Sequence, residues 1–196
     1  YAVWTLCEDS DSTIWVGRVG NGGLDLFNKK TGKFKKYKHD PADINTISND
    51  MVSYIFRDGV NDLWVGTFNN GGLNKLDIRT GKFTRYLSGL SIGKIYRDAA
   101  DILWFATNGG LFRYDRKTDV FYALANKNSE NNITTVDGIV ADKEDNLWLS
   151  TVTGIYMVTK NRDQVIHYGK ESVAPGNNFI FFTPSCFVRQ DGEISF

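Results

Sequence analysis

The chain has 196 residues, of which 41% are apolar and 14% aromatic, so it can bury a substantial core as a single domain. Its 23 basic residues balance 23 acidic ones, which argues against nucleic acid or an anionic membrane surface as a partner. No run of 18 apolar residues predicts a transmembrane helix, and the first five residues do not resemble a signal peptide. The sequence therefore predicts a globular segment that makes no membrane contact.

One pattern recurs four times along the chain. In each copy a tryptophan follows an aspartate after six positions, with Leu or Ile directly before it: Asp9 and Trp15, Asp58 and Trp64, Asp98 and Trp104, Asp142 and Trp148. The tryptophans are 49, 40 and 44 residues apart, whereas the spacing of six within each pair is constant. A constant core joined by segments of variable length is typical of a repeat protein.

The other landmarks of the repeat are turns and packing positions. A small residue lies two positions after each tryptophan: Gly17, Gly66, Ala106 and Ser150. An Asn/Asp-x-x-Thr-Gly turn follows in the first two copies, and its last position requires positive φ. We predict that this position is occupied in the four copies by Gly32, Gly81, Asp119 and Asp163.

Runs of β-branched and aromatic residues between the turns predict four strands per copy and almost no helix. In the second copy we place the strands near residues 51–57, 62–67, 73–77 and 82–87. The copies span about 1–38, 49–87, 91–124 and 134–168, and a partial fifth copy spans 180–196. In the fifth copy Ser195 replaces the tryptophan, and a match of Asp191 with Asp142 makes its turn two residues shorter.

Four-stranded sheets with apolar side chains on both faces must stack on one another. Radial stacking gives an all-β fold, a β-propeller segment of four four-stranded blades plus the start of a fifth. The repeated tryptophans are interpreted as packing between blades rather than as ligand contacts.

The segment Asn61-Asp62-Leu63-Trp64-Val65-Gly66-Thr67, followed by Gly71-Gly72-Leu73, resembles the two-component regulator propeller repeat. The resemblance covers nearly the whole chain. It implies a ring of about seven blades in the periplasmic sensor region of a hybrid two-component system. It further implies that an oligosaccharide is sensed and that the signal reaches a histidine kinase elsewhere in the full-length protein.

The sequence does not predict catalysis, a metal or a cofactor. His39 and His167 lack the spacing of metal ligands or of a catalytic triad. The segment that begins at Asp9 starts like a calcium loop, but Ile14 stands where that loop requires glycine. Cys7 and Cys186 are expected near first strands of blades that lie apart, and therefore unpaired.

Ligand binding is expected on the loops that join the second strand to the third and each blade to the next, since variable loops on a rigid scaffold carry binding sites. Amides, an aromatic ring and a guanidinium suit a hydroxyl-rich sugar. The candidate residues are Arg18, Asn21, Phe68, Asn69 and Asn108. The alternative for asparagines that precede glycine is a role in the turn alone.

Three functions are consistent with the sequence. The first is an oligosaccharide-binding sensor segment of a hybrid two-component regulator. The second is a propeller that binds a partner protein, a second copy or the remaining blades of a full-length sensor, and the third is an enzyme that acts on polysaccharides.

Overall fold

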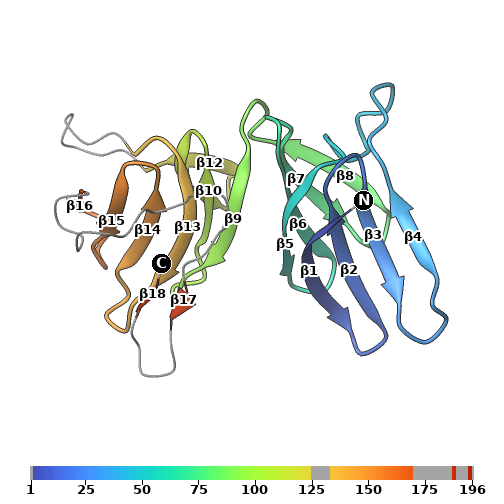
Figure 1. The fold of residues 1–196 in the computed structure, drawn as a ribbon, viewed down its shortest axis with the longest axis horizontal. Helices are drawn as coiled ribbons and strands as arrows, with labels where there is room; N and C mark the ends of the chain where they lie inside the picture. Colours follow the sequence, from blue (N-terminus) through green and yellow to red (C-terminus); the bar gives the residue numbers. More distant parts are fainter. Residues whose placement is uncertain (1, 125–132, 170–186, 189–193, 196) are drawn as a thin grey trace. The chain divides into compact units, whose positions relative to one another are not determined.

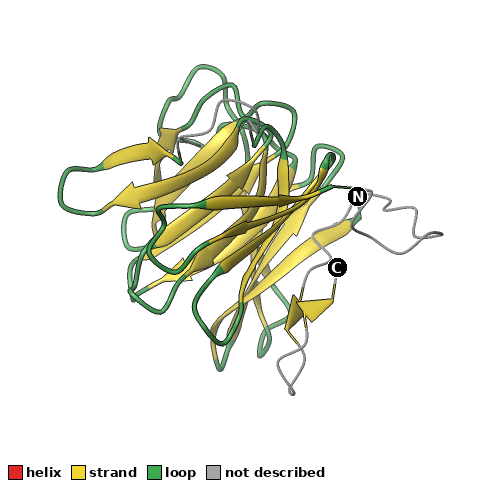
Figure 2. Cartoon of the chain, turned by 90° about the vertical axis from the view of Figure 1, so that its left-hand side faces the viewer, coloured by secondary structure: helices red, strands yellow, loops and turns green. Residues whose placement is uncertain are grey.

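The computed structural model describes residues 2–124, 133–169, 187–188 and 194–195 as strands, turns and loops (Figures 1 and 2). The chain divides into two compact units, residues 1–92 and 93–196. Within the described residues, no helix is long and apolar enough to cross a membrane.

Each full repeat forms one four-stranded antiparallel sheet in which spatial order follows chain order. The first blade contains β1 (Val3–Ser10), β2 (Thr13–Arg18), β3 (Gly23–Asn28) and β4 (Phe34–Tyr37), and the second contains β5 (Val52–Asp58), β6 (Asp62–Thr67), β7 (Gly72–Asp77) and β8 (Lys82–Tyr86). The third contains β9 (Ile92–Arg97), β10 (Leu103–Thr107), β11 (Gly110–Asp115) and β12 (Val120–Ala123), and the fourth contains β13 (Val136–Ala141), β14 (Leu147–Thr151), β15 (Gly154–Val158) and β16 (Val165–Tyr168). The chain is therefore an all-β propeller segment, as predicted, and the four strands expected in the second copy are confirmed.

The start of a fifth blade is also confirmed. β17 (Phe187–Val188) pairs antiparallel with β18 (Ile194–Ser195). Phe187 lies opposite Ser195, as Val140 lies opposite Trp148 in the fourth blade. Ser195 therefore takes the tryptophan position.

The shorter turn expected in this fifth hairpin is wrong. The pair Val188 and Ile194 encloses as many residues as the pair Ala141 and Leu147 in the fourth blade. By this count the residue at the aspartate position is Arg189, which follows Val188 in the sequence. Asp191, which we had matched to that position, lies outside the described residues.

A hydrogen bond explains the constant spacing of six. In every blade the indole Nε1–H of the tryptophan donates to the carboxylate that closes the first strand, at 2.9 Å (Trp15 to Asp9), 3.0 Å (Trp64 to Asp58), 2.8 Å (Trp104 to Asp98) and 2.8 Å (Trp148 to Asp142). The first two strands form a hairpin of fixed length, so this length brings the carboxylate to the indole.

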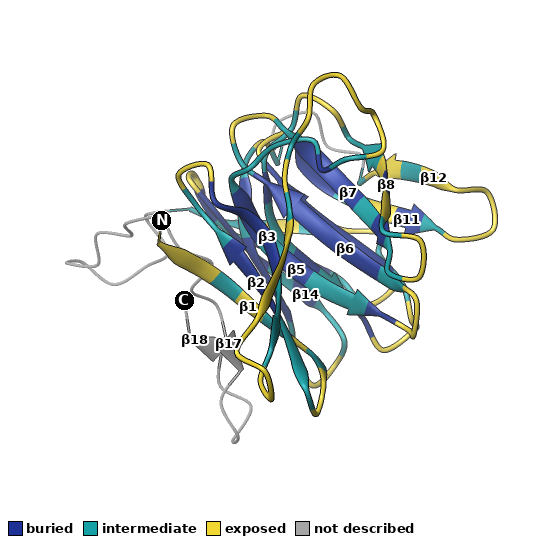
Figure 3. Ribbon diagram, turned by 90° about the vertical axis from the view of Figure 1, so that its right-hand side faces the viewer, coloured by how far each residue is buried: buried dark blue, intermediate teal, exposed yellow. Residues whose placement is uncertain are grey.

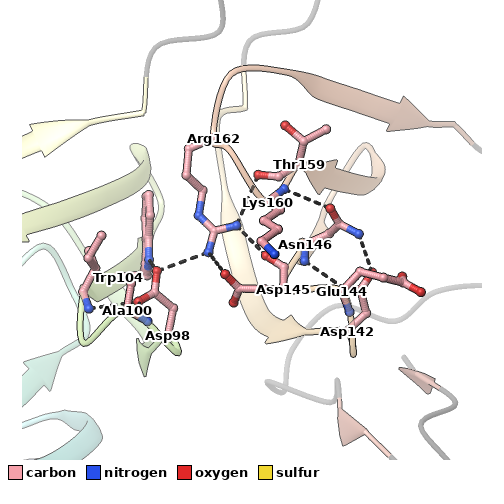
Figure 4. A network of polar contacts seen from close by, with 11 residues as sticks. Asp98, Ala100, Trp104, Asp142, Glu144, Asp145, Asn146, Thr159, Lys160 and Arg162 are labelled. Carbon is pink, nitrogen blue, oxygen red and sulfur yellow. Dashed lines mark hydrogen bonds and ion pairs between the residues drawn. The ribbon is translucent and has the colours of Figure 1, made fainter.

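Arginine side chains connect two of these four pairs to the next blade. In the unit of residues 93–196, Arg162 Nη2 lies 3.2 Å from the buried Asp98 and 3.3 Å from Asp145, and its guanidinium stacks 5.6 Å from the Trp104 ring (Figure 4). In the unit of residues 1–92, Arg57 of β5 lies 3.4 Å from Asp9. Each arginine therefore neutralises the aspartate of the preceding blade.

The cores lie between successive blades within each unit. Trp15 and Leu24 of the first blade pack with Val52, Ile55 and Leu63 of the second, and the buried residues follow the facing strands (Figure 3). The corresponding cluster between the third and fourth blades contains Trp104, Leu111, Val136, Ile139 and Leu147. The interpretation of Trp15 and Trp104 as packing residues between blades is confirmed. Trp64 is fully buried, and Trp148 is only partly buried.

The small residue after the tryptophan has a steric cause. A Cβ atom at Gly17 would lie 2.5 Å from Thr5 Cγ2 and 2.6 Å from Val52 Cγ1. Any larger side chain would therefore push the second blade away from the first.

Three of the four predicted positive-φ residues are confirmed, with φ of 68° at Gly32, 76° at Gly81 and 57° at Asp119. The fourth prediction, Asp163, is wrong because Arg162 has φ of 61° instead. The turn is tighter there: the N–H of Arg162 donates to Thr159 O three residues back, whereas that of Gly32 donates to Asn28 O four residues back. The left-handed residue therefore comes one position earlier.

Replacing Asp98 should be costly, because its carboxylate accepts from Trp104 and two backbone N–H groups and pairs with Arg162. We expect Asp98→Ala to lower the free energy of unfolding by about 3 kcal/mol in urea denaturation. The control Asp77→Ala removes a turn carboxylate that accepts from the backbone N–H groups of Arg79 and Thr80, and it should lower the free energy of unfolding by clearly less. Equal losses for both variants would contradict a structural role for the aspartate–tryptophan pair.

Candidate functional site

The loops of residues 1–92 are held on a rigid scaffold. In the connection 38–51, Asp50 Oδ1 accepts from the His39 backbone N–H at 2.8 Å, and Arg85 Nε donates to Thr46 O at 3.0 Å. Asn74 of β7 accepts from the N–H of Ser48 at 2.8 Å and donates to its hydroxyl at 2.8 Å. These bonds tie a long connection to the strands of the second blade.

An exposed aromatic pair lies at one end of these blades. Trp4 and Phe68 make an edge-to-face contact with ring centroids 5.8 Å apart and planes at 86°. Trp4 is 43% exposed and occupies a β-bulge between Val3 and Thr5. Phe68 is held because its backbone N–H donates to Met51 O at 2.9 Å. The pair offers a partly exposed apolar surface to a ligand.

The asparagines beside Phe68 have a structural role. Asn69 and Asn70 have φ of 53° and 58°, a region that asparagine tolerates better than most residues. The Asn70 N–H donates to Ser91 Oγ at 3.0 Å, and Asn69 Nδ2 lies 2.8 Å from the sulfur of Met51. Asn21 also has positive φ, at 64°. The turn role left open for asparagines before glycine therefore applies to Asn21 and Asn70.

The other predicted binding residues are more dispersed. Arg18 Nε lies 2.7 Å from the buried carboxylate of Asp25, which turns the guanidinium along the outer face of the first blade. Asn21 lies in the turn after β2, and its carbonyl accepts from Lys38 Nζ. Asn108 is exposed in the turn after β10, in the other unit. The structure thus brings Phe68 and Asn69 together with Trp4, a residue that sequence reasoning missed.

Trp4 belongs to a series of bulge residues at one repeat position. Ser53 and Asp137 occupy equivalent bulges in β5 and β13, and Gly93 stands at this position in β9. In β1, β5 and β13 the side chain at this bulge varies while the register shift recurs. This variation directly after Val3, Val52 and Val136, the apolar residues 12 positions before each tryptophan, was a usable signal.

Two bulge residues are polar and incompletely satisfied. Ser53 Oγ and Asp137 Oδ2 are enclosed without a hydrogen-bond partner in the described chain. Burial raises the pKa of the Asp137 carboxyl above its ordinary value. A buried polar atom without a protein partner can be satisfied by a bound water, an ion or a ligand.

Cys7 and the two histidines make local structural contacts in the part of the chain that the structure describes. Cys7 is unpaired in β1, and burial raises the pKa of its thiol, which disfavours the reactive thiolate. Cys186 lies outside the described residues. His39 Nδ1 lies 2.8 Å from Ile47 O, and His167 stacks on Tyr156 at 4.3 Å. No cluster of three metal-ligating side chains occurs among the residues that the structure describes.

No family model and no curated protein matches the chain. Among solved structures, it resembles the extracellular domain of the hybrid two-component system BT4673 of B. thetaiotaomicron, with 22% identity and a TM-score of 0.78 over 98% of this chain and 25% of that one. The extracellular domain of BT3049 from the same organism gives 20% identity and a TM-score of 0.53 over 98% of this chain and 31% of that one. A streptogramin B lyase gives 21% identity and a TM-score of 0.62 over 98% of this chain and 67% of that one.

These likenesses establish the fold. The chain spans about a quarter of the BT4673 domain, which has the same blade architecture. At this level of identity the fold is shared by extracellular domains of two-component systems and by a lyase, so function has to be argued from the site.

The unpaired carboxyl of Asp137 should lower stability at neutral pH. The pKa of Asp137 is higher in the folded protein than its ordinary value of 3.8. Ionisation of Asp137 therefore lowers the free energy of unfolding as the pH rises from 3.8 through the folded-state pKa. We expect Asp137→Asn to raise the free energy of unfolding at pH 7, and this gain to vanish as the pH falls to about 4.

The control for this comparison is Asp115→Asn in the same unit. Hydrogen bonds to the Asp115 carboxylate lower its pKa, and the largest contribution comes from the backbone N–H of Lys117. The ionised form of Asp115 therefore stabilises the fold at pH values above the ordinary pKa. Asp115→Asn should therefore lower stability at pH 7, with the loss shrinking in acid. A loss at pH 7 for Asp137→Asn would contradict an unsatisfied carboxyl at the bulge.

Proposed function

We propose that the chain is a ligand-binding segment of the extracytoplasmic, periplasmic sensor region of a hybrid two-component regulator, and that its ligand is an oligosaccharide. The signal would pass to a histidine kinase elsewhere in the full-length protein. The likeness of the fold to the extracellular domains of BT4673 and BT3049 supports a sensor role.

The observation that carries the sugar proposal is the Trp4–Phe68 pair, in which Trp4 is exposed and Phe68 is half-buried. An aromatic face that remains accessible in a rigid loop cluster can stack on the apolar face of a pyranose ring. The exposed Asn69 amide lies in the same turn as Phe68 and can exchange hydrogen bonds with sugar hydroxyls. The four aspartate-bonded tryptophans have a packing role in the blades, and Trp4 lies outside that pattern.

Two other functions follow from different observations. Exposed apolar side chains on the outer face of the first blade favour docking of a partner protein or a further blade. A polysaccharide-active propeller would need a pair of facing carboxyl groups. Asp137 supplies one such group. The partly exposed aromatic pair favours binding of a sugar, so we propose binding rather than catalysis.

Removing the aromatic pair should weaken binding. In isothermal titration calorimetry with an oligosaccharide selected from a glycan array, Trp4→Ala and Phe68→Ala should each raise Kd roughly tenfold. The control Tyr122→Ala removes an aromatic side chain that is 42% exposed, close to the 43% of Trp4, and should leave Kd unchanged. Equal affinities for all three variants and the unmodified chain would place the sugar elsewhere.

A further inference from the structure

The outer hairpin of the first blade carries a concentration of positive charge. Residues 29–39 contain six lysines and no acidic residue: Lys29, Lys30, Lys33, Lys35, Lys36 and Lys38. Because the chain as a whole is neutral, its remaining residues have a formal charge of −6. The equivalent segment of the second blade, residues 78–88, has three basic residues. The charge is therefore a feature of this blade rather than of the repeat.

The lysines of this hairpin are exposed, and most of them are not neutralised by an acid. Lys29 lies 3.4 Å from Glu8, and Lys38 lies 3.6 Å from Asp50. The other four lysines form no ion pair within the part of the chain that the structure describes. Neighbouring charges on one strand lie within a Debye length of each other, so they attract an acidic partner together.

The same hairpin presents main-chain groups that can pair with another strand. β4 is the last strand of its sheet, and β3 is its neighbour (Figure 1). The N–H of Asn28 donates to Lys33 O at 2.9 Å, so these two residues form a hydrogen-bonded pair. Because such pairs alternate along an antiparallel ladder, Phe34 and Lys36 direct their N–H and C=O groups away from β3. The outer edge of β4 can therefore accept a further strand.

Protection of the edge explains only part of this pattern. Lysines on an edge strand hinder its pairing with other edge strands. However, β12 (sequence VFYA) and β16 (sequence VIHY) are last strands of their sheets as well, and neither contains Lys or Arg. Lys29 and Lys30 precede β4 and lie in its turn, where they do not cover the strand. The number of lysines thus exceeds what protection of this edge requires.

The geometry of the lysines indicates which kind of partner fits. Lys35 and Lys36 are consecutive in β4, so their side chains project from opposite faces of the sheet. A flat membrane surface can approach one of these faces, whereas an extended peptide that lies along β4 reaches both. A second copy of the chain is not complementary, because its described outer strands are basic (β4 and β8) or lack charge (β12 and β16).

From the open edge and its charge, we infer that β4 binds an acidic peptide segment of another protein as a fifth strand of the first blade. The outward main-chain groups of Phe34 and Lys36 bond to the peptide, and carboxylates on both of its faces pair with the lysines. The inference does not depend on the proposed sugar site, because Trp4 belongs to β1 at the opposite edge of this sheet.

The probe is a fluorescent peptide of repeated Thr-Glu-Glu, which presents glutamate on both faces when it is extended. In fluorescence anisotropy with the whole chain, replacing Lys33, Lys35 and Lys36 together by Gln should raise the Kd of the peptide roughly tenfold or more. The control replaces Lys82, Lys117 and Lys160 by Gln. These exposed lysines lie in the outer hairpins of the other three blades, and their loss should leave Kd unchanged.

Two further measurements separate strand addition from simple attraction of a polyanion. Lys36→Pro should weaken binding more than Lys36→Gln, because proline also removes an N–H that points away from β3. In the unmodified chain, the peptide should slow hydrogen exchange of the Phe34 and Lys36 amides, and polygalacturonate of equal charge should not.

The inference is overturned if the two triple variants bind the peptide equally well, or if the Phe34 and Lys36 amides stay unprotected. It is also overturned if polygalacturonate or vesicles of phosphatidylglycerol bind as tightly as the peptide, since the edge would then attract any polyanion. Trp4→Ala should leave the Kd of the peptide unchanged, so a failure at β4 and a failure at the sugar site are distinguished.

Discussion

The hydrogen bond between the tryptophan indole and the aspartate six residues earlier is the constraint on which the blades depend. Trp15, Trp64 and Trp104 are at most 1% exposed, and a buried indole N–H without an acceptor would cost about 1–3 kcal/mol. The acceptor is a carboxylate, and a carboxylate in a blade interface requires positive charge nearby. Arg57 and Arg162 meet this requirement from different places in the repeat, one from a first strand and one from a turn. The buried indole N–H thus accounts for the length of the hairpin formed by the first two strands and for the aspartate that closes its first strand. It also accounts for the arginine that pairs with Asp9 and with Asp98 from the next blade.

The same hydrogen bond constrains the residues that pack the blades but not the residues that are available for ligand binding. Positions that serve the tryptophan, the small residue and the turns are nearly constant, and they leave the bulge of the first strand and the connecting loops free to vary. Trp4, Ser53 and Asp137 share one backbone geometry but present an aromatic ring, a hydroxyl and a carboxyl. A repeat fold can change its ligand in this way without altering its packing.

The sequence predicts the fold well because the signals are local and repeated. Strand limits, the packing role of Trp15 and the positive φ of Gly32 all follow from spacing and turn chemistry. The prediction of positive φ at Asp163 was wrong, because the turn is one residue tighter and the left-handed residue comes one position earlier. Only the hydrogen bond from the Arg162 N–H to Thr159 O reveals this change. The candidate site was predicted less completely. Phe68 and Asn69 were found from their loop, but the contact of Trp4 with Phe68 joins residues of different blades and no local pattern encodes it.

The tryptophans themselves allow the central claim to be tested directly. In a heteronuclear spectrum of the chain, the indole N–H groups of Trp15, Trp64, Trp104 and Trp148 are bonded to aspartates and serve as internal references, while Trp4 reports on the loop surface. On titration with a bound oligosaccharide, the Trp4 resonance should shift in a saturable manner while those of the other four remain in place. Saturable shifts in the four aspartate-bonded indoles without a shift of Trp4 would contradict this claim.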